Sequence, residues 1–156
     1  MKSATTREAS RHDRRLLASW KILVAIGIAA VLMGLWFILL RPSVVLLPED
    51  SRFTGLTPEQ FQALSPKLFE WAGFVFRSWG AFAIGLGILI VSIATNAYRR
   101  AERWAWLALA VSGLLTFSIF FAVNVALGSD FRLVIAGLMV VYAFALWLPW
   151  RVFWRK

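Results

Sequence analysis

The sequence predicts an all-α integral membrane protein, an antiparallel four-helix bundle with both termini on the cytoplasmic side (N-in/C-in). Three observations lead to this fold class. Apolar residues make up 60% of the 156 residues and charged residues 16%, whereas soluble domains average about 45–50% and about 25%. Four uncharged runs are each long enough to cross a hydrocarbon core of about 30 Å. Lysine and arginine are concentrated on one side of these runs.

The four uncharged runs contain 19, 21, 26 and 18 residues. None of them alternates apolar and polar residues, which excludes a strand barrel. We expect residues 21–151 to form the transmembrane domain, between a basic cytoplasmic tail (1–20) and a basic cytoplasmic end (152–156). The outer loop is residues 42–70, with a short amphipathic helix. The expected spans lie at about 21–41, 71–97, 104–128 and 131–150.

Charge fixes the expected orientation. The face that holds both termini carries twelve basic and three acidic residues, and the other face carries five of each, so the whole net charge of +9 lies on one side. Basic loops stay in the cytoplasm, which predicts a multi-pass protein of the inner membrane whose basic face contacts anionic lipid. Nucleic acid is not an expected partner, because the charges sit between apolar runs.

The first forty residues have an alternative interpretation as a cleavable signal peptide, because a basic region precedes an apolar run. The run of 19 residues is longer than the usual signal core, however, and no small-x-small cleavage site precedes Arg41-Pro42. We therefore expect an uncleaved first span.

The outer loop contains two helix start signals. Thr57-Pro58-Glu59-Gln60 has the pattern of a capping box with proline in the first helical position. Ser65-Pro66 repeats the signal and predicts a helix that continues into the second span. Pro42 and Pro48 interrupt any helix before these signals. The loop is interpreted either as a lid over the outer mouth of the bundle or as a plain interfacial connector.

Small residues predict a packing face on the second span. Gly73, Gly80 and Gly87 are seven residues apart, and Ala81 with Gly85 adds a small-xxx-small pair. Small residues let helix backbones approach closely where lipid gives no hydrophobic drive between helices. We expect these five residues to pack against other helices.

Four polar residues are the candidate ligand-binding site. Glu70 and Arg77 share the helical stripe of the glycines, and we expect them to face inward with it. Asn124 and Asp130 lie at a similar outer depth. Ionisable groups within membrane spans are functional candidates because burying them unpaired is costly. The alternative is structural: Arg77 extends to the interface, and Asn124 makes a hydrogen bond between helices.

Absent residue types exclude several chemistries. The chain has no cysteine, and His12, its only histidine, lies in the tail. No span supplies an imidazole or a thiolate, so we expect no metal site and no cofactor. A zinc peptidase and a serine–histidine hydrolase are excluded, and we expect no catalytic residues.

Part of the chain resembles a known group. Arg77-Ser78-Trp79-Gly80, Gly85-Leu86-Gly87 and Glu102-Arg103-Trp104-Ala105-Trp106 are similar to segments of small DoxX-like bacterial four-helix membrane proteins. The similarity covers roughly residues 53–113. It implies a four-helix bundle, and some members of the group are associated with quinone or thiosulfate oxidation complexes.

Together these observations predict a non-catalytic accessory or assembly component of the membrane. We expect the glycine-rich face to pack with a second copy or with a larger membrane complex. One alternative is a protein that binds a lipophile, a quinone or a lipid, through the four polar residues. Another alternative is a small membrane enzyme that uses the same cluster.

Overall fold

The computed structural model describes residues 2–154, with side chains from Arg14 onward. Every regular element in this range is helical and none is a strand, which confirms the all-α prediction. Three helices are long and apolar enough to cross a membrane, within Arg14–Ser43, Pro66–Tyr98 and Arg103–Ala126. Some side chains of the predicted cytoplasmic face lie outside the described residues, namely Lys2, Arg7, Glu8, Arg11, His12, Asp13, Arg155 and Lys156.

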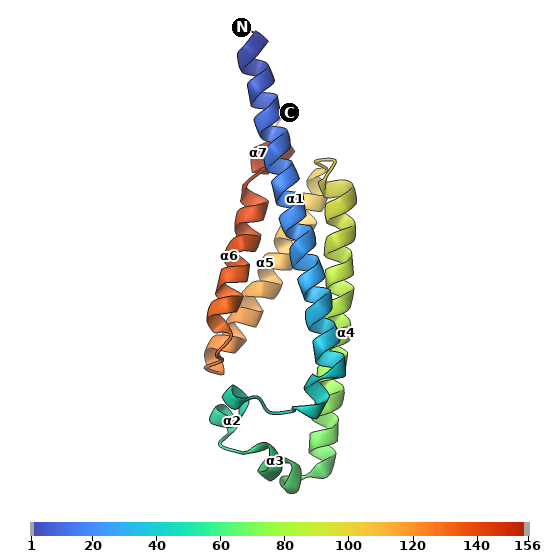
Figure 1. The fold of residues 1–156 in the computed structure, drawn as a ribbon, viewed down its shortest axis with the longest axis vertical. Helices are drawn as coiled ribbons and strands as arrows, with labels where there is room; N and C mark the ends of the chain where they lie inside the picture. The colour runs from blue at the N-terminus through green and yellow to red at the C-terminus, as the bar shows by residue number, and fades with distance from the viewer. Residues whose placement is uncertain (1, 155–156) are drawn as a thin grey trace.

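The first helix, α1 (Lys2–Leu39), is continuous for 38 residues, about 57 Å at roughly 1.5 Å per residue. The predicted tail, residues 1–20, is therefore part of this helix from Lys2 onward. The cause is local, because no glycine or proline, the two residues least favourable inside a helix, occurs before Gly27. Figure 1 shows this end of α1 projecting beyond the other helices.

The outer loop contains three short helical elements where one was predicted. They are a 3-10 turn, η1 (Arg41–Ser43), and the helices α2 (Pro48–Thr54) and α3 (Pro58–Leu64). The capping box of α3 is confirmed: Thr57 Oγ1 accepts from the Gln60 N–H at 3.2 Å, and Gln60 Oε1 accepts from the Thr57 N–H at 2.9 Å. The helix α2 was not predicted, because a proline ends a preceding helix but is also well suited to the first turn of a new one.

The fourth helix, α4 (Pro66–Ile93), begins at Ser65 as predicted. Ser65 Oγ accepts a hydrogen bond from the N–H of Leu68 at 3.2 Å. The helix continues through a π-helical turn, η2 (Ala94–Tyr98). It therefore carries the second predicted span from the outer loop to the basic end of the molecule.

The helices α1 and α4 pack antiparallel through glycines spaced seven residues apart on both of them. A Cβ on Gly80 would lie 2.6 Å from the carbonyl oxygen of Gly34, and one on Gly87 would lie 2.5 Å from that of Gly27. Further out, a Cβ on Gly73 would meet Pro42 at 3.6 Å. Gly80 and Gly87 therefore lie at the α1–α4 interface, and Gly73 faces the η1 turn that follows α1.

A second helix pair follows along the chain, α5 (Arg103–Ala126) and α6 (Arg132–Trp147). Gly113 admits the ring of Tyr142, since a Cβ there would lie 2.2 Å from Tyr142 Cζ. The hydroxyl of Tyr142 donates to the carbonyl of Leu109 at 2.7 Å. At 16 residues, about 24 Å at roughly 1.5 Å per residue, α6 is the shortest of the four long apolar helices.

The two pairs meet at the end of the molecule that carries the termini. Ser19 Oγ donates to the carbonyl of Ala145 at 2.6 Å and accepts from the hydroxyl of Tyr98 at 2.6 Å. Phe153, in the short helix α7 (Trp150–Trp154), packs its buried ring on Tyr98 at 4.8 Å between centroids. The predicted basic end, residues 152–156, therefore starts inside a packed helix. In Figure 1 the pairs α1–α4 and α5–α6 converge at this end and are joined at the other by α2.

Candidate functional site

The four polar residues of the predicted cluster take separate partners. Glu70 pairs with Lys67 at 2.8 Å, and Asp130 accepts from Arg52 at 2.7 Å. The amide of Asn124 donates back to the carbonyl of Phe120 at 2.8 Å, within its own helix. The remaining member, Arg77, is exposed, with its guanidinium 5.7 Å from the ring centroid of Phe74. Among the described contacts, none joins two of the four predicted residues.

Arg77 and Glu70 do not point inward, and both are exposed. Their angle around the helix is not the reason, because Ile84 follows Arg77 by seven residues, about 20° away around the helix, and contacts α1 at Gly34. Arg77 and Glu70 lie nearer the end of α1, where Gly73 faces Pro42 of η1.

The five predicted packing residues fall into two groups. Gly73, Gly80 and Gly87 are buried, Gly80 and Gly87 against α1 and Gly73 beside η1, whereas Ala81 and Gly85 are exposed. A Cβ added to Gly85 would meet no atom within 4 Å. The second group therefore forms a face of small residues that the chain itself leaves uncovered.

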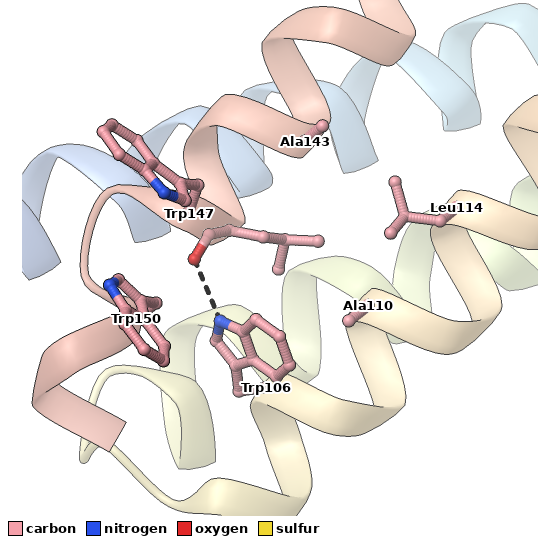
Figure 2. A pocket seen from close by; sticks show the side chains of 7 residues that line it. Trp106, Ala110, Leu114, Ala143, Trp147 and Trp150 are labelled. Atoms are coloured by element: carbon pink, nitrogen blue, oxygen red, sulfur yellow. Dashed lines mark hydrogen bonds between the residues drawn. The ribbon is translucent and has the colours of Figure 1, made fainter. Parts of the chain in front are cut away.

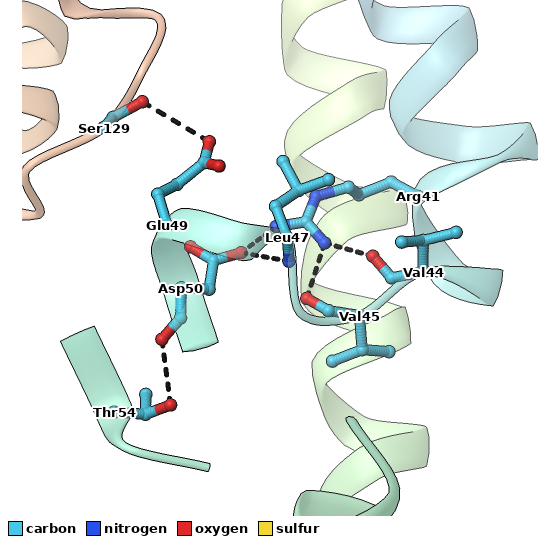
Figure 3. A network of polar contacts seen from close by, with 8 residues as sticks. All are labelled: Arg41, Val44, Val45, Leu47, Glu49, Asp50, Thr54 and Ser129. Carbon is cyan, nitrogen blue, oxygen red and sulfur yellow. Dashed lines mark hydrogen bonds and ion pairs between the residues drawn. The ribbon is translucent and has the colours of Figure 1, made fainter. Parts of the chain in front are cut away.

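The structure buries a different charged group, which the sequence did not point to. Arg41, at the end of the first span, is only 4% exposed. Its Nη1 donates to the carbonyls of Val44 and Val45, and its Nη2 donates to Asp50 (Figure 3). Its guanidinium carbon also lies 4.2 Å from the ring centroid of Phe76 in α4. The first part of the outer loop is thus folded around one arginine.

The carboxylate of Asp50 also stabilises the start of α2. It accepts from the backbone N–H of Leu47 at 2.9 Å, as Gln60 does for Thr57 in α3. Leu47-Pro48-Glu49-Asp50 and Thr57-Pro58-Glu59-Gln60 thus share proline in the first turn and an acceptor three residues after the N-cap. This repeated order is the signal in the sequence from which α2 could have been predicted.

Two contacts join α2 to the turn between α5 and α6. Glu49, only 5% exposed, accepts from Ser129 Oγ at 3.4 Å. Arg52 pairs with Asp130 on the exposed surface, and the hydrogen bond to Asp130 raises the pKa of the Arg52 guanidinium. The outer loop therefore links the two helix pairs at the end opposite their shared core.

At the other end, a groove opens between α5 and α6 (Figure 2). It has a volume of about 230 Å³. The indole N–H of Trp106 donates to the carbonyl of Leu146 at 2.9 Å across it. The other lining side chains are apolar or tryptophan: Ala110, Leu114, Ala143, Trp147 and Trp150.

The turn between η2 and α5 carries an ion pair. Glu102 accepts from Arg100 Nε at 2.7 Å and from the indole N–H of Trp104 at 2.6 Å. These hydrogen bonds, that from Arg100 first, lower the pKa of the Glu102 carboxyl. The turn keeps its ion pair at neutral pH as a result.

The described surfaces are an exposed face of small residues on α4 and an apolar groove beside α5. Within the side chains described from Arg14 to Trp154, no group of three or more histidine, cysteine or acidic residues is placed to hold a metal ion. Arg41 binds loop backbone and Asp50, and Glu49 accepts from Ser129. No family model, curated protein or solved structure matches the chain.

Proposed function

We propose that the chain is an accessory or assembly component of the inner membrane, which it crosses four times with both termini in the cytoplasm. Charge supports the orientation, since twelve of the seventeen basic residues belong to the face predicted to be cytoplasmic. Seven of the twelve have described side chains, and these lie at the end where the two helix pairs meet: Arg14, Arg15, Lys21, Arg99, Arg100, Arg103 and Arg151. Three helices have the length and apolarity of spans. The fourth span is α6, extended by the tryptophans at its end, which suit the lipid–water interface.

The exposed small-residue face of α4 is the observation that carries the assembly role. Ala81 and Gly85 lie on it with Ser78 and Ser92, all exposed and within about 60° of one another around the helix. In the 18-residue windows of the three long spans, only 17–22% of the residues are buried inside the chain. The face is therefore available to a helix of another chain.

Small residues at such positions allow helices to pack at short distance, where dispersion and weak hydrogen bonds act over many atoms. The chain uses this device internally between α1 and α4. We propose that the face of Ala81 and Gly85 uses it a second time, between chains. The partner is a second copy or a helix of a larger membrane complex.

A leucine at Gly85 tests this proposal. The side chain has open space in the monomer, so the fold is expected to persist, while close approach of a partner helix is blocked. Association between donor- and acceptor-labelled copies, or recovery of the native complex, is expected to fall about tenfold or more, equivalent to a loss of about 1.4 kcal/mol.

Gly137→Leu is the matched control. Gly137 lies in α6, is exposed, and also has no atom within 4 Å of an added Cβ. The Gly137→Leu substitution adds the same atoms to the apolar surface, away from the proposed face of Ala81 and Gly85. Equal association of the wild type, Gly85→Leu and Gly137→Leu proteins would contradict the proposal.

The lipophile-binding and enzymatic alternatives both use the cluster of Glu70, Arg77, Asn124 and Asp130. Each of these residues has its own partner or lies on the exposed surface, so the geometry gives neither alternative comparable support. The similarity to DoxX-like proteins rests on the motifs of the second and third spans alone. A link of this chain to quinone or thiosulfate oxidation is likewise a proposal that rests on those motifs.

A further inference from the structure

The side chains that line the groove between α5 and α6 change along its length from tryptophan to aliphatic. Figure 2 shows the indoles of Trp106, Trp147 and Trp150 gathered at one end and the aliphatic side chains of Leu114 and Ala143 at the other. Indole rings favour the level of lipid headgroups, and aliphatic side chains favour the hydrocarbon region. The groove therefore has the same order of polarity as a phospholipid.

Two arginines lie at the indole end. Arg103 Nε donates to the carbonyl of Phe153 at 2.8 Å, and its guanidinium carbon lies 5.4 Å from the ring centroid of Trp154. The ring of Trp154 in turn packs edge-on against Trp106, in the wall of the groove, at 6.2 Å. Arg151 is exposed and follows Trp150 in α7.

These groups have unused hydrogen-bonding capacity. Among the described residues, the Nη groups of Arg103, the guanidinium of Arg151 and the indole N–H groups of Trp147 and Trp150 have no hydrogen-bond partner. Trp147 is 64% exposed and Trp150 is 45% exposed. A phosphate at this end would receive donors from arginine, which pairs well with phosphate oxygens.

We propose that the groove binds an anionic phospholipid of the cytoplasmic leaflet. One acyl chain lies along Ala110, Leu114 and Ala143, and the phosphate contacts Arg103 and Arg151. Charge complementarity favours this occupant over a second copy of the chain, whose own basic end would repel the same arginines. The volume of about 230 Å³ is below the range of about 300–1,000 Å³ for whole small-molecule ligands, so the groove holds part of one acyl chain and the headgroup stays outside it.

The site depends on the membrane orientation in the proposed function but not on the association face of α4. The two proposals therefore fail separately. Gly85→Leu is expected to change association and leave lipid binding unchanged. Blocking the groove is expected to have the opposite effect.

The test is native mass spectrometry of the delipidated protein in mild detergent, titrated with phosphatidylglycerol or phosphatidylcholine of identical acyl chains. Phosphatidylglycerol is expected to bind at least about fivefold more tightly, because each basic residue near an anionic headgroup contributes roughly 1 kcal/mol. Arg151→Gln is expected to reduce its binding by about fivefold for the same reason. Arg15→Gln, which removes an exposed charge from the same face, is expected to leave it unchanged.

A second pair of variants tests the acyl-chain part of the site. Ala143→Phe places a ring in the groove, whereas Ala122→Phe adds the same ring at an exposed alanine of α5 outside it. Only Ala143→Phe is expected to abolish the binding of phosphatidylglycerol. Equal binding of the two lipids would overturn the proposal, as would equal loss in Arg15→Gln and Arg151→Gln. Phosphatidylglycerol that stays bound to the Ala143→Phe protein would also overturn it, as would displacement of the lipid by a second copy of the chain.

Discussion

A leucine in place of Gly80 is expected to break the packing of α1 on α4. A Cβ at this position would lie 2.6 Å from the backbone oxygen of Gly34 and 2.8 Å from the side chain of Ile38. A side chain can rotate away from such a clash, but the Gly34 carbonyl can move only if the whole helix moves. Because the two glycine pairs set the distance between the helices, the entire interface is expected to separate.

The expected cost is about 3 kcal/mol or more, the upper part of the range for overpacked interiors. Unfolding in a titration with sodium dodecyl sulfate, followed by tryptophan fluorescence, measures it. Gly34→Leu is expected to act in the same way from the other helix. Gly137→Leu, in open space, is expected to leave the midpoint unchanged or raise it slightly, since leucine is the better helix former. Equal midpoints for Gly80→Leu and Gly137→Leu would show that α1 and α4 do not pack through these glycines.

Removal of the Arg41 side chain is the second change with a large expected effect. Arg41 is 4% exposed and contacts two backbone carbonyls, the Asp50 carboxylate and the Phe76 ring. Arg41→Ala leaves the Asp50 carboxylate, whose side chain is 20% exposed, without its ion-pair partner. Breaking a buried pair from one side typically costs about 3–5 kcal/mol, because a buried charge is left uncompensated.

The loss is expected to appear in two measurements. The midpoint of unfolding falls, and the outer loop becomes a substrate for an added protease, since Arg41 holds the backbone on both sides of Val45 in place. Arg52→Ala is the control, because it breaks an exposed ion pair of the same loop, and such pairs contribute little. An Arg41→Ala protein as stable and as protease-resistant as Arg52→Ala would contradict the structural role of Arg41.

Local features of the fold follow from the sequence, and long-range ones do not. The capping box at Thr57 and the start of α4 at Ser65 depend on neighbouring residues alone, and both are confirmed. The partners of Gly80 and Gly87 on α1 were accessible in principle, because Gly27 and Gly34 share their seven-residue spacing. The pairing of Ser19 with Tyr98 and Ala145 joins three helices, and no local pattern indicates it.

The candidate site was harder to predict for a physical reason. Arg77 and Arg41 both lie beside an uncharged apolar run, and position along the chain does not separate a buried arginine from an exposed one. Burial depends on what packs above the side chain. For Arg41 this is the loop it organises, through Val44, Val45 and Asp50, whereas the side chain of Arg77 stays exposed.

Membrane topology is the claim on which the association face, the lipid groove and the outer loop all depend. The chain has no cysteine, so a single introduced cysteine can be labelled without background. In intact cells, a membrane-impermeant maleimide is expected to label Gln62→Cys in α3 and Phe131→Cys before α6. It is expected to label Arg15→Cys, Arg99→Cys and Arg151→Cys only after the membrane is opened. Labelling of Arg151→Cys from outside, or protection of Phe131→Cys, would contradict the four-span orientation.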